Sequence, residues 1–219
     1  MATVERPLRK DAERNRQRIL DAAQELFTER GLGVTLNDIA HHADVGVGTV
    51  YRRFPDKQRL IDALFDERIG EMVRLAEESL AEPDPWEGLV GFLERGLDLQ
   101  ACNRGLKELL QDAPEGSELV EGARDQLVPL VTALVERARD AGALRADVQH
   151  EDLPLIQMMI GEIIDRTRHV DPELWRRYLE LVLRGLRAHP DPTERLSIPA
   201  PDVDQLDCVM RTPPPPRRR

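Results

Sequence analysis

Cysteines, aromatic residues and long apolar runs are all scarce in this chain of 219 residues. Its two cysteines, Cys102 and Cys208, are too few for a disulfide scaffold and supply no spacing typical of a zinc site. Aromatic residues make up only 4% of the chain, which argues against a β-sandwich or β-barrel. No stretch approaches the roughly 20 apolar residues of a membrane span, and no apolar run follows the basic residues near the N-terminus. We therefore expect neither a span nor a signal peptide, and we expect the protein in the cytoplasm.

The motifs of common enzyme classes are missing as well. The chain has no G-x-G-x-x-G, P-loop, H-E-x-x-H or G-x-S-x-G pattern. His41 and His42 are adjacent, but neighbouring positions on a helix do not face one metal ion. We expect no enzymatic activity, no metal and no cofactor, and a helical enzyme without these motifs is kept as an alternative.

Charge is distributed unevenly along the chain. The net charge is −10, yet residues 1–57 carry +1 and the remainder carries −11. A weakly basic segment joined to an acidic body suits a protein with a nucleic-acid-binding head. An ordinary solvated surface explains the same charges equally well.

Apolar residues recur at helical spacing over most of the chain. Ile19, Ala23, Leu26 and Phe27, for example, mark one face of the first helix. Ala, Leu, Glu and Arg dominate the composition, which also favours helix, so we predict an all-α fold. About nine helices are expected, over residues 11–30, 36–43, 47–54, 57–80, 84–101, 104–111, 117–141, 151–168 and 172–188.

Residues 35–57 have the pattern of a helix-turn-helix. Thr35 can cap the first short helix, with Asp38 at the capping-box spacing, and Asp44-Val45-Gly46 forms a three-residue break. Ala40 is small where the two helices must cross closely, and Val45 can point into the core. Plain core packing of two short helices is the alternative interpretation.

The second helix of this pair buries one stripe and exposes another. Val50 and Phe54 form the buried stripe, whereas Val47, Gly48, Thr49, Arg52 and Arg53 are expected to face outward. An outward face with two arginines and a tyrosine suits the base edges and phosphates of a DNA major groove. Arg14, Arg16 and Arg18 on the first helix are expected to add non-specific affinity.

The segment TLNDIAHHADVGVGTVYRRFPDKQRLIDALF resembles the N-terminal DNA-binding domain of TetR-type transcriptional regulators. The resemblance covers about residues 14–65. It implies double-stranded DNA as a partner, with Thr35 and Lys57 on phosphates, Tyr51 on the backbone and the other positions facing bases. The implied DNA-binding residues are Thr35, Asn37, Val47, Gly48, Thr49, Tyr51, Arg52, Arg53 and Lys57. Two positions depart from the usual pattern: Gly46 replaces a capping serine, and Asp44 replaces a turn glycine and must adopt a positive φ.

This resemblance implies an N-terminal three-helix domain joined by a long fourth helix to a larger helical domain. We expect a flexible basic leader over residues 1–10, the helix-turn-helix domain over 11–56 and a ligand-binding and dimerisation domain over 57–188. A disordered Pro/Arg-rich tail is expected over 189–219. The last two helices are apolar on more than one side, which favours a homodimer interface. The candidate interface residues are Leu155, Ile156, Met159, Ile160, Ile163, Leu174, Trp175, Tyr178, Leu179, Val182 and Leu186.

A small-molecule effector of unknown identity is also expected. Its candidate binding residues are Trp86, Phe92, Cys102, Asn103, Leu106, Leu130, Leu134, Met158, Met159 and Glu162, many of which could equally be plain core. The expected function is a ligand-responsive regulator, a repressor that binds a pseudo-palindromic operator as a dimer and is released by its effector. The alternative is a helical ligand-binding protein whose head is an architectural or co-regulator interaction module.

Overall fold

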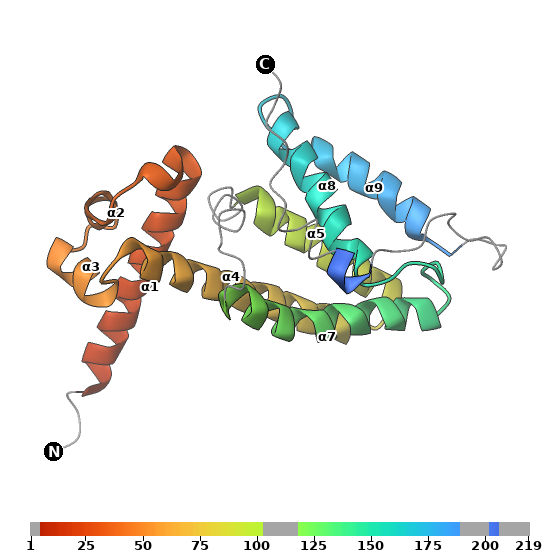
Figure 1. The fold of residues 1–219 in the computed structure, drawn as a ribbon, viewed down its shortest axis with the longest axis horizontal. Coiled ribbons are helices and arrows are strands. Elements are labelled where there is room, and N and C mark those ends of the chain that lie inside the picture. Colours follow the sequence, from red (N-terminus) through yellow and green to blue (C-terminus); the bar gives the residue numbers. More distant parts are fainter. Residues whose placement is uncertain (1–4, 103–117, 189–201, 206–219) are drawn as a thin grey trace. The chain divides into compact units, whose positions relative to one another are not determined.

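The computed structural model describes residues 5–102, 118–188 and 202–205, and most of these residues are helical (Figure 1). They divide into two compact units, with residues 5–68 and 102 in the first and residues 69–101, 118–188 and 202–205 in the second. Over these ranges the chain forms no β-strand, and one isolated bridge pairs Leu144 with Arg187. None of the helices found there has the length and apolar character needed to cross a membrane. The prediction of an all-α fold is confirmed.

The first unit is built around the helix-turn-helix. It contains α1 (Glu5–Arg30), a short 3-10 turn (Gly31–Gly33), α2 (Leu36–His42), α3 (Val47–Arg53) and the start of α4 (Lys57–Ala81). The apolar face predicted for α1 is buried, since Ile19, Ala23, Leu26 and Phe27 are all at most 2% exposed. Gly31 follows α1 with a φ of 66°, the left-handed conformation that ends many helices.

Two boundaries of the first unit differ from those expected. Helix α1 begins at Glu5 rather than near residue 11, so part of the expected flexible leader is helical. Pro7 is compatible with this start because the first turn of a helix needs no backbone N–H donors. The unit also extends past residue 56 to Arg68, since Leu60 and Leu64 of α4 pack into its core.

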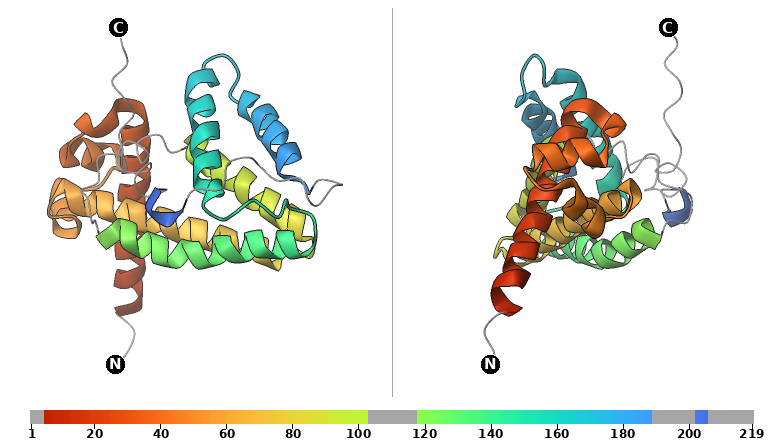
Figure 2. Two further views of the ribbon diagram at one scale, coloured as in Figure 1. Left: turned by 45° about the vertical axis from the view of Figure 1, so that its right-hand side comes forward. Right: turned by 90° about the vertical axis from the view of Figure 1, so that its left-hand side faces the viewer.

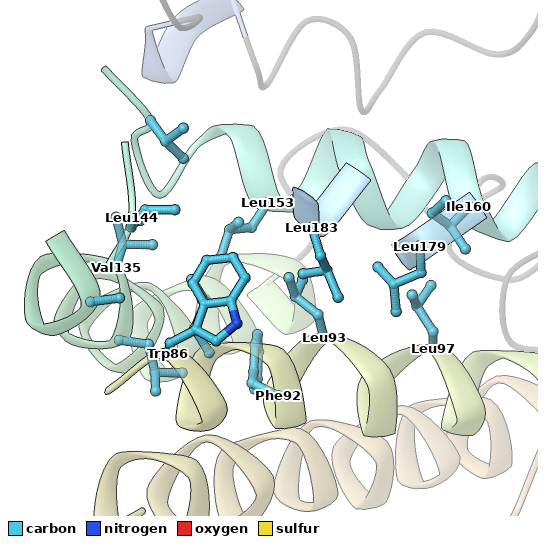
Figure 3. Close-up of a cluster of buried hydrophobic side chains, with 14 of the residues drawn as sticks. Trp86, Phe92, Leu93, Leu97, Val135, Leu144, Leu153, Ile160, Leu179 and Leu183 are labelled. Atoms are coloured by element: carbon cyan, nitrogen blue, oxygen red, sulfur yellow. The ribbon is translucent and has the colours of Figure 1, made fainter. Parts of the chain in front are cut away.

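The second unit is a bundle that shares one apolar core. It contains the rest of α4 together with α5 (Pro85–Cys102), α7 (Glu118–Asp140), α8 (Asp152–Thr167) and α9 (Leu174–Leu186). Both Figure 1 and Figure 2 show α8 and α9 side by side. Figure 3 shows Leu93 and Leu97 of α5 pointing toward Leu179 and Leu183 of α9, and all four belong to the buried cluster.

The helices of this unit follow the predicted ranges with small differences. Asp84 caps α5, because its Oδ1 accepts the backbone N–H of Trp86 at 2.8 Å. Helix α7 runs without interruption through Pro129, so the proline does not restart it. Helix α9 begins at Leu174, two residues later than expected. The helix expected over 104–111 lies outside the described residues, and so does nearly all of the tail expected over 189–219.

The C-terminal end of α4 is held closely by its neighbours. The guanidinium of Arg137 on α7 donates to the carbonyl oxygens of Leu80, Glu82 and Pro83 at 2.9, 2.6 and 3.0 Å. A Cβ placed on Gly88 of α5 would lie 2.5 Å from the backbone oxygen of Ser79. The two helices therefore approach so closely that only glycine fits at position 88.

Candidate nucleic-acid interface

Helix α3 buries one stripe of side chains and exposes the opposite one. Val50 is fully buried and Phe54, which follows the helix, is 4% exposed, whereas Val47 and Tyr51 are 37% and 45% exposed. Arg52 and Arg53 are exposed as well. The predicted division of this helix into inward and outward faces is confirmed, and the outward face combines two cations with an aromatic hydroxyl.

The turn between α2 and α3 has the geometry that the sequence requires. Ala40 is fully buried at the helix crossing, and Val45 packs against the core of the first unit. Asp44 adopts a φ of 51°, as predicted for a residue that replaces a turn glycine. Arg18 of α1 holds it, because its Nη2 lies 3.3 Å from the Asp44 carbonyl oxygen and 3.4 Å from its carboxylate. Gly46 is the N-cap of α3 and supplies no side-chain hydrogen bond.

Thr35 and Asp38 form the predicted capping box at the start of α2. The Thr35 hydroxyl donates to Asp38 Oδ2 at 2.6 Å, and its backbone N–H donates to the same oxygen at 2.9 Å. These two hydrogen bonds favour the charged carboxylate and lower the pKa of Asp38 from its ordinary value of 3.8, the hydroxyl contributing most. Both Thr35 donors expected to face a phosphate are thus directed at Asp38. The capping box and a phosphate would thus compete for the same two donors of Thr35.

The two arginines of α3 have different surroundings. Arg52 Nε donates to the carbonyl oxygen of Gly48, and Arg52 Nη2 donates to Thr49 Oγ1, both at 3.2 Å. Arg53 instead lies 3.9 Å from the carboxylate of Glu13 on α1, a long ion pair between exposed side chains. Arg52 is therefore folded back over its own helix, whereas Arg53 is directed toward α1.

Lys57 lies at the first turn of α4, where the chain leaves the helix-turn-helix. Its Nζ is 5.5 Å from the centroid of the Phe27 ring, and the side chain is half-buried. Asp56 caps the helix, since its Oδ1 accepts the backbone N–H of Arg59 at 2.8 Å. The Phe27 contact holds the ammonium near the end of α4 that carries the positive dipole.

The three arginines of α1 that were expected to add non-specific affinity, Arg14, Arg16 and Arg18, are each paired with an acidic residue. Arg14 lies 3.5 Å from Asp11, Arg16 lies 3.5 Å from Glu13, and Arg18 contacts Asp44 at the turn. Their expected contribution to non-specific DNA affinity is correspondingly reduced, because each charge is partly compensated. Arg18 has a structural role at the turn that the sequence did not indicate.

The candidate effector residues that the structure describes have different surroundings. Trp86, Phe92 and Leu134 belong to the packed core, and Leu130 is partly buried against it. Met158 and Met159 are 41% and 47% exposed on α8, and Glu162 is exposed there as well. Asn103 and Leu106 lie outside the described residues, and so does the side chain of Cys102. Trp86, Phe92 and Leu134 are therefore core residues, because neighbouring helices pack directly against their side chains.

The candidate interface residues separate into two groups. Ile160, Trp175 and Leu179 are at most 1% exposed within their own chain, so they are core and cannot contact a second copy. Tyr178 and Met159 are exposed, and the partly exposed members are Leu155, Ile156, Ile163, Leu174, Val182 and Leu186. Leu181 and Met158, 55% and 41% exposed, were not predicted for this surface. Leu181 continues the stripe of Leu174 and Tyr178 at helical spacing, a signal the sequence contained.

The fold and the exposed face of α3 define a helix-turn-helix transcriptional regulator with a separate helical unit. Residues 19–64 match the model of bacterial regulatory proteins of the tetR family, and residues 84–188 match the C-terminal domain of SbtR-like transcriptional regulators. The chain belongs to the TetR family of transcriptional regulators.

Individual relatives agree with this assignment. A TetR transcription regulatory protein from Mycobacterium vanbaalenii is 33% identical with a TM-score of 0.63, over 83% of this chain and 99% of that chain. A TetR transcriptional regulator from Streptomyces coelicolor is 32% identical with a TM-score of 0.63, over 79% and 98%. An HTH-type transcriptional regulator of Staphylococcus aureus strain MRSA252 is 36% identical over 109 residues, which are 47% of this chain. This match spans 56% of that relative's own length.

Proposed function

We propose that this protein is a repressor that binds a pseudo-palindromic operator as a homodimer in the cytoplasm and is released by a small-molecule effector. The observation that carries the proposal is the outward face of α3, where Tyr51, Arg52 and Arg53 are exposed above a core formed by Val50 and Phe54. Such a helix fits the width of the major groove of B-form DNA.

The DNA contacts follow from the chemistry of each exposed group. Val47 and Thr49 offer methyl groups to thymine, and Tyr51 offers its hydroxyl to the DNA backbone. Lys57 and Arg53 supply charge for phosphates, and each such contact releases counterions from the duplex. Asn37 and Gly48 complete the proposed surface. Thr35 contributes only if its donors leave Asp38 when DNA binds.

Dimerisation is supported by the exposed apolar stripe on α9 and its neighbours on α8. Leu174, Tyr178 and Leu181 recur at intervals of four and three residues, so they lie along one line of the helix. Met158 and Met159 are the exposed apolar residues of α8. A two-fold axis would place the same stripe of a second copy against this one, and removal of these side chains from water would stabilise the pair. The two α3 helices of the dimer would then enter grooves about 34 Å apart or a near multiple of that distance.

Effector release is proposed because α4 contributes to both units. Leu60 and Leu64 belong to the core of the first unit, whereas Leu75 and Ala76 belong to the core of the second. A small molecule in the second unit would act through α4 only to the extent that it binds one arrangement of the helix more tightly than another. Leu130, Met158 and Glu162 stay candidates for this site. No catalytic role is proposed for any residue.

A gel-shift titration tests the proposal. Full-length protein is titrated against the duplex upstream of its own gene and against a scrambled duplex of equal length, at several salt concentrations. We expect specific binding with a two-fold footprint, at least a hundredfold tighter than binding to the scrambled duplex. The double variant Arg52→Ala/Arg53→Ala should lose this specificity, whereas the control Arg74→Ala, which removes an exposed arginine from α4, should keep it.

Three outcomes would contradict the proposal. Equal binding to both duplexes would favour the architectural or co-regulator module. Retention of full specificity by the double variant would show that the two arginines of α3 do not read the DNA. Effector release is tested separately: a ligand found by thermal-shift screening should weaken operator binding. Unchanged operator affinity with this ligand bound would refute the release step.

A further inference from the structure

Arg52 and Thr49 form a connected pair on the exposed face of α3. Arg52 lies one helical turn after Gly48 and Thr49, so its side chain can fold back toward the N-terminal end of the helix. In that position its Nε donates to the Gly48 carbonyl oxygen and its Nη2 to Thr49 Oγ1, both at 3.2 Å. Arg52 makes no other hydrogen bond or ion pair to the described part of the chain. Position 48 leaves open space, since a Cβ built on Gly48 would meet nothing within 4 Å.

These two hydrogen bonds decide which edge of the guanidinium is left for DNA. A guanidinium has five N–H groups in one plane. The side edge, made by Nε and Nη2, faces Gly48 and Thr49. The end edge, made by Nη1 and the second hydrogen of Nη2, carries two parallel N–H groups, and Nη1 makes no hydrogen bond to the described part of the chain. Two parallel donors match the paired acceptors O6 and N7 of guanine and no other base edge in the major groove.

Arg53 lacks such an arrangement. Among the described side chains its guanidinium has one neighbour of opposite charge, Glu13, at 3.9 Å, and both side chains are more than half exposed. A long contact of this kind fixes neither the orientation of the planar group nor the edge that it presents. Arg53 is therefore suited to neutralising phosphates, and only Arg52 is held in one orientation by its own helix.

We infer that Arg52 reads a guanine end-on in each half-site and that Thr49 is the positioning residue that orients it through its hydroxyl. This inference rests on the proposed function, which it refines by naming the base and the residue that selects it. Thr49 restricts the guanidinium before DNA arrives, so less conformational freedom is lost on binding. Loss of the hydroxyl should reduce discrimination at one base pair by about 3- to 10-fold, because ordering one long side chain has a cost of that order.

Substitutions at position 49 separate the hydroxyl from the methyl group. Thr49→Val keeps the β-branched shape and removes the hydrogen-bond acceptor, whereas Thr49→Ser keeps the acceptor and removes the methyl. Full-length protein first selects its preferred operator from a pool of randomised duplex DNA. Fluorescence anisotropy then measures the affinity of each variant for that operator and for duplexes carrying each single base-pair change. Circular dichroism checks that every variant keeps its helical content and melting temperature.

The expected result is a position-specific change. The wild-type protein should require a guanine at one position of each half-site, and Arg52→Ala should lose that requirement. Thr49→Val should lose about 3- to 10-fold of the preference at the same position and leave the other positions unchanged. Thr49→Ser should keep it.

Failure of this inference is distinguishable from failure of the proposed function. If the wild-type protein selects no sequence from the pool, the proposed function itself is wrong. If it selects an operator but the base sensitive to Arg52→Ala is not guanine, the assignment of Arg52 is overturned. If Thr49→Val weakens all duplexes equally or changes nothing, or if Thr49→Ser behaves like Thr49→Val, Thr49 does not position Arg52.

Discussion

Replacement of Arg137 by methionine should destabilise the second unit measurably. Arg137→Met keeps most of the aliphatic stem and removes the guanidinium that donates to the carbonyl oxygens of Leu80, Glu82 and Pro83. The bond to Leu80 is partly buried, and the other two are exposed, so water can replace them. A hydrogen bond from a charged group contributes about 1.5–3 kcal/mol when water cannot substitute for it. A cation near a helix C-terminus adds roughly 0.3–1 kcal/mol.

The expected loss is therefore about 2 kcal/mol in the free energy of unfolding. For a chain of this size this lowers the melting temperature by roughly 4–8 °C. Both tryptophans, Trp86 and Trp175, are buried in the core of the second unit, so tryptophan fluorescence in urea follows that unit alone. The matched control is Arg74→Met on the exposed surface of α4, which should change stability by less than about 0.5 kcal/mol. Equal stability of Arg137→Met and Arg74→Met would refute the view that Arg137 holds the end of α4.

Four other perturbations have defined outcomes. Lys57→Ala should weaken binding to all duplexes about equally and lower the salt slope of log affinity by about one, as measured by titrations at several salt concentrations; a change confined to one base pair would show that Lys57 reads sequence. Asp44→Ala should destabilise the first unit by about 1 kcal/mol in far-UV circular dichroism melts, whereas Asp44→Gly should be nearly neutral, because only alanine is strained at a φ of 51°. Leu181→Glu should convert a dimer to a monomer in analytical ultracentrifugation. The control Val170→Glu changes a residue that precedes α9 and is 76% exposed, and it should leave the dimer intact. If both variants stay dimeric, the interface lies elsewhere. The pKa of Asp38 is lowered in the folded state, so its carboxylate stabilises the fold above its ordinary pKa, and this contribution is lost as the pH falls through the lowered value. The difference in stability between wild type and Asp38→Asn should therefore shrink below about pH 4. A difference that stays constant with pH would contradict the capping role of Asp38.

Local features of the first unit were predictable because they depend on residues close together in the chain. The Thr35 and Asp38 capping box and the buried stripe of Val50 and Phe54 follow from spacing over at most four residues. The positive φ of Asp44 was predicted from the resemblance, which places a turn glycine at this position. The start of α1 at Glu5 was missed because few signals separate a helical basic segment from a flexible one.

Packing between distant segments was harder to predict. Helices α8 and α9 are apolar on more than one side, and periodicity cannot say which side faces the core. Contacts with α5 decide it, since Leu97 and its neighbours cover Leu179 and Ile160 and leave Leu181 exposed. Thr35 is a different case, because the predicted capping box already directs its backbone N–H at Asp38, a donor that was also expected to face a phosphate.

The close approach of α5 to α4 at Gly88 limits how this protein can be engineered for stability. Exchange of a helical glycine for alanine ordinarily stabilises a helix by roughly 0.5–1 kcal/mol, and Gly122 on α7, with open space around it, is suited to that exchange. At position 88 the same exchange would force a methyl group onto a main-chain oxygen that cannot rotate away. A library of all substitutions at position 88 that is selected for stability should therefore retain glycine alone, although alanine has the higher helix propensity.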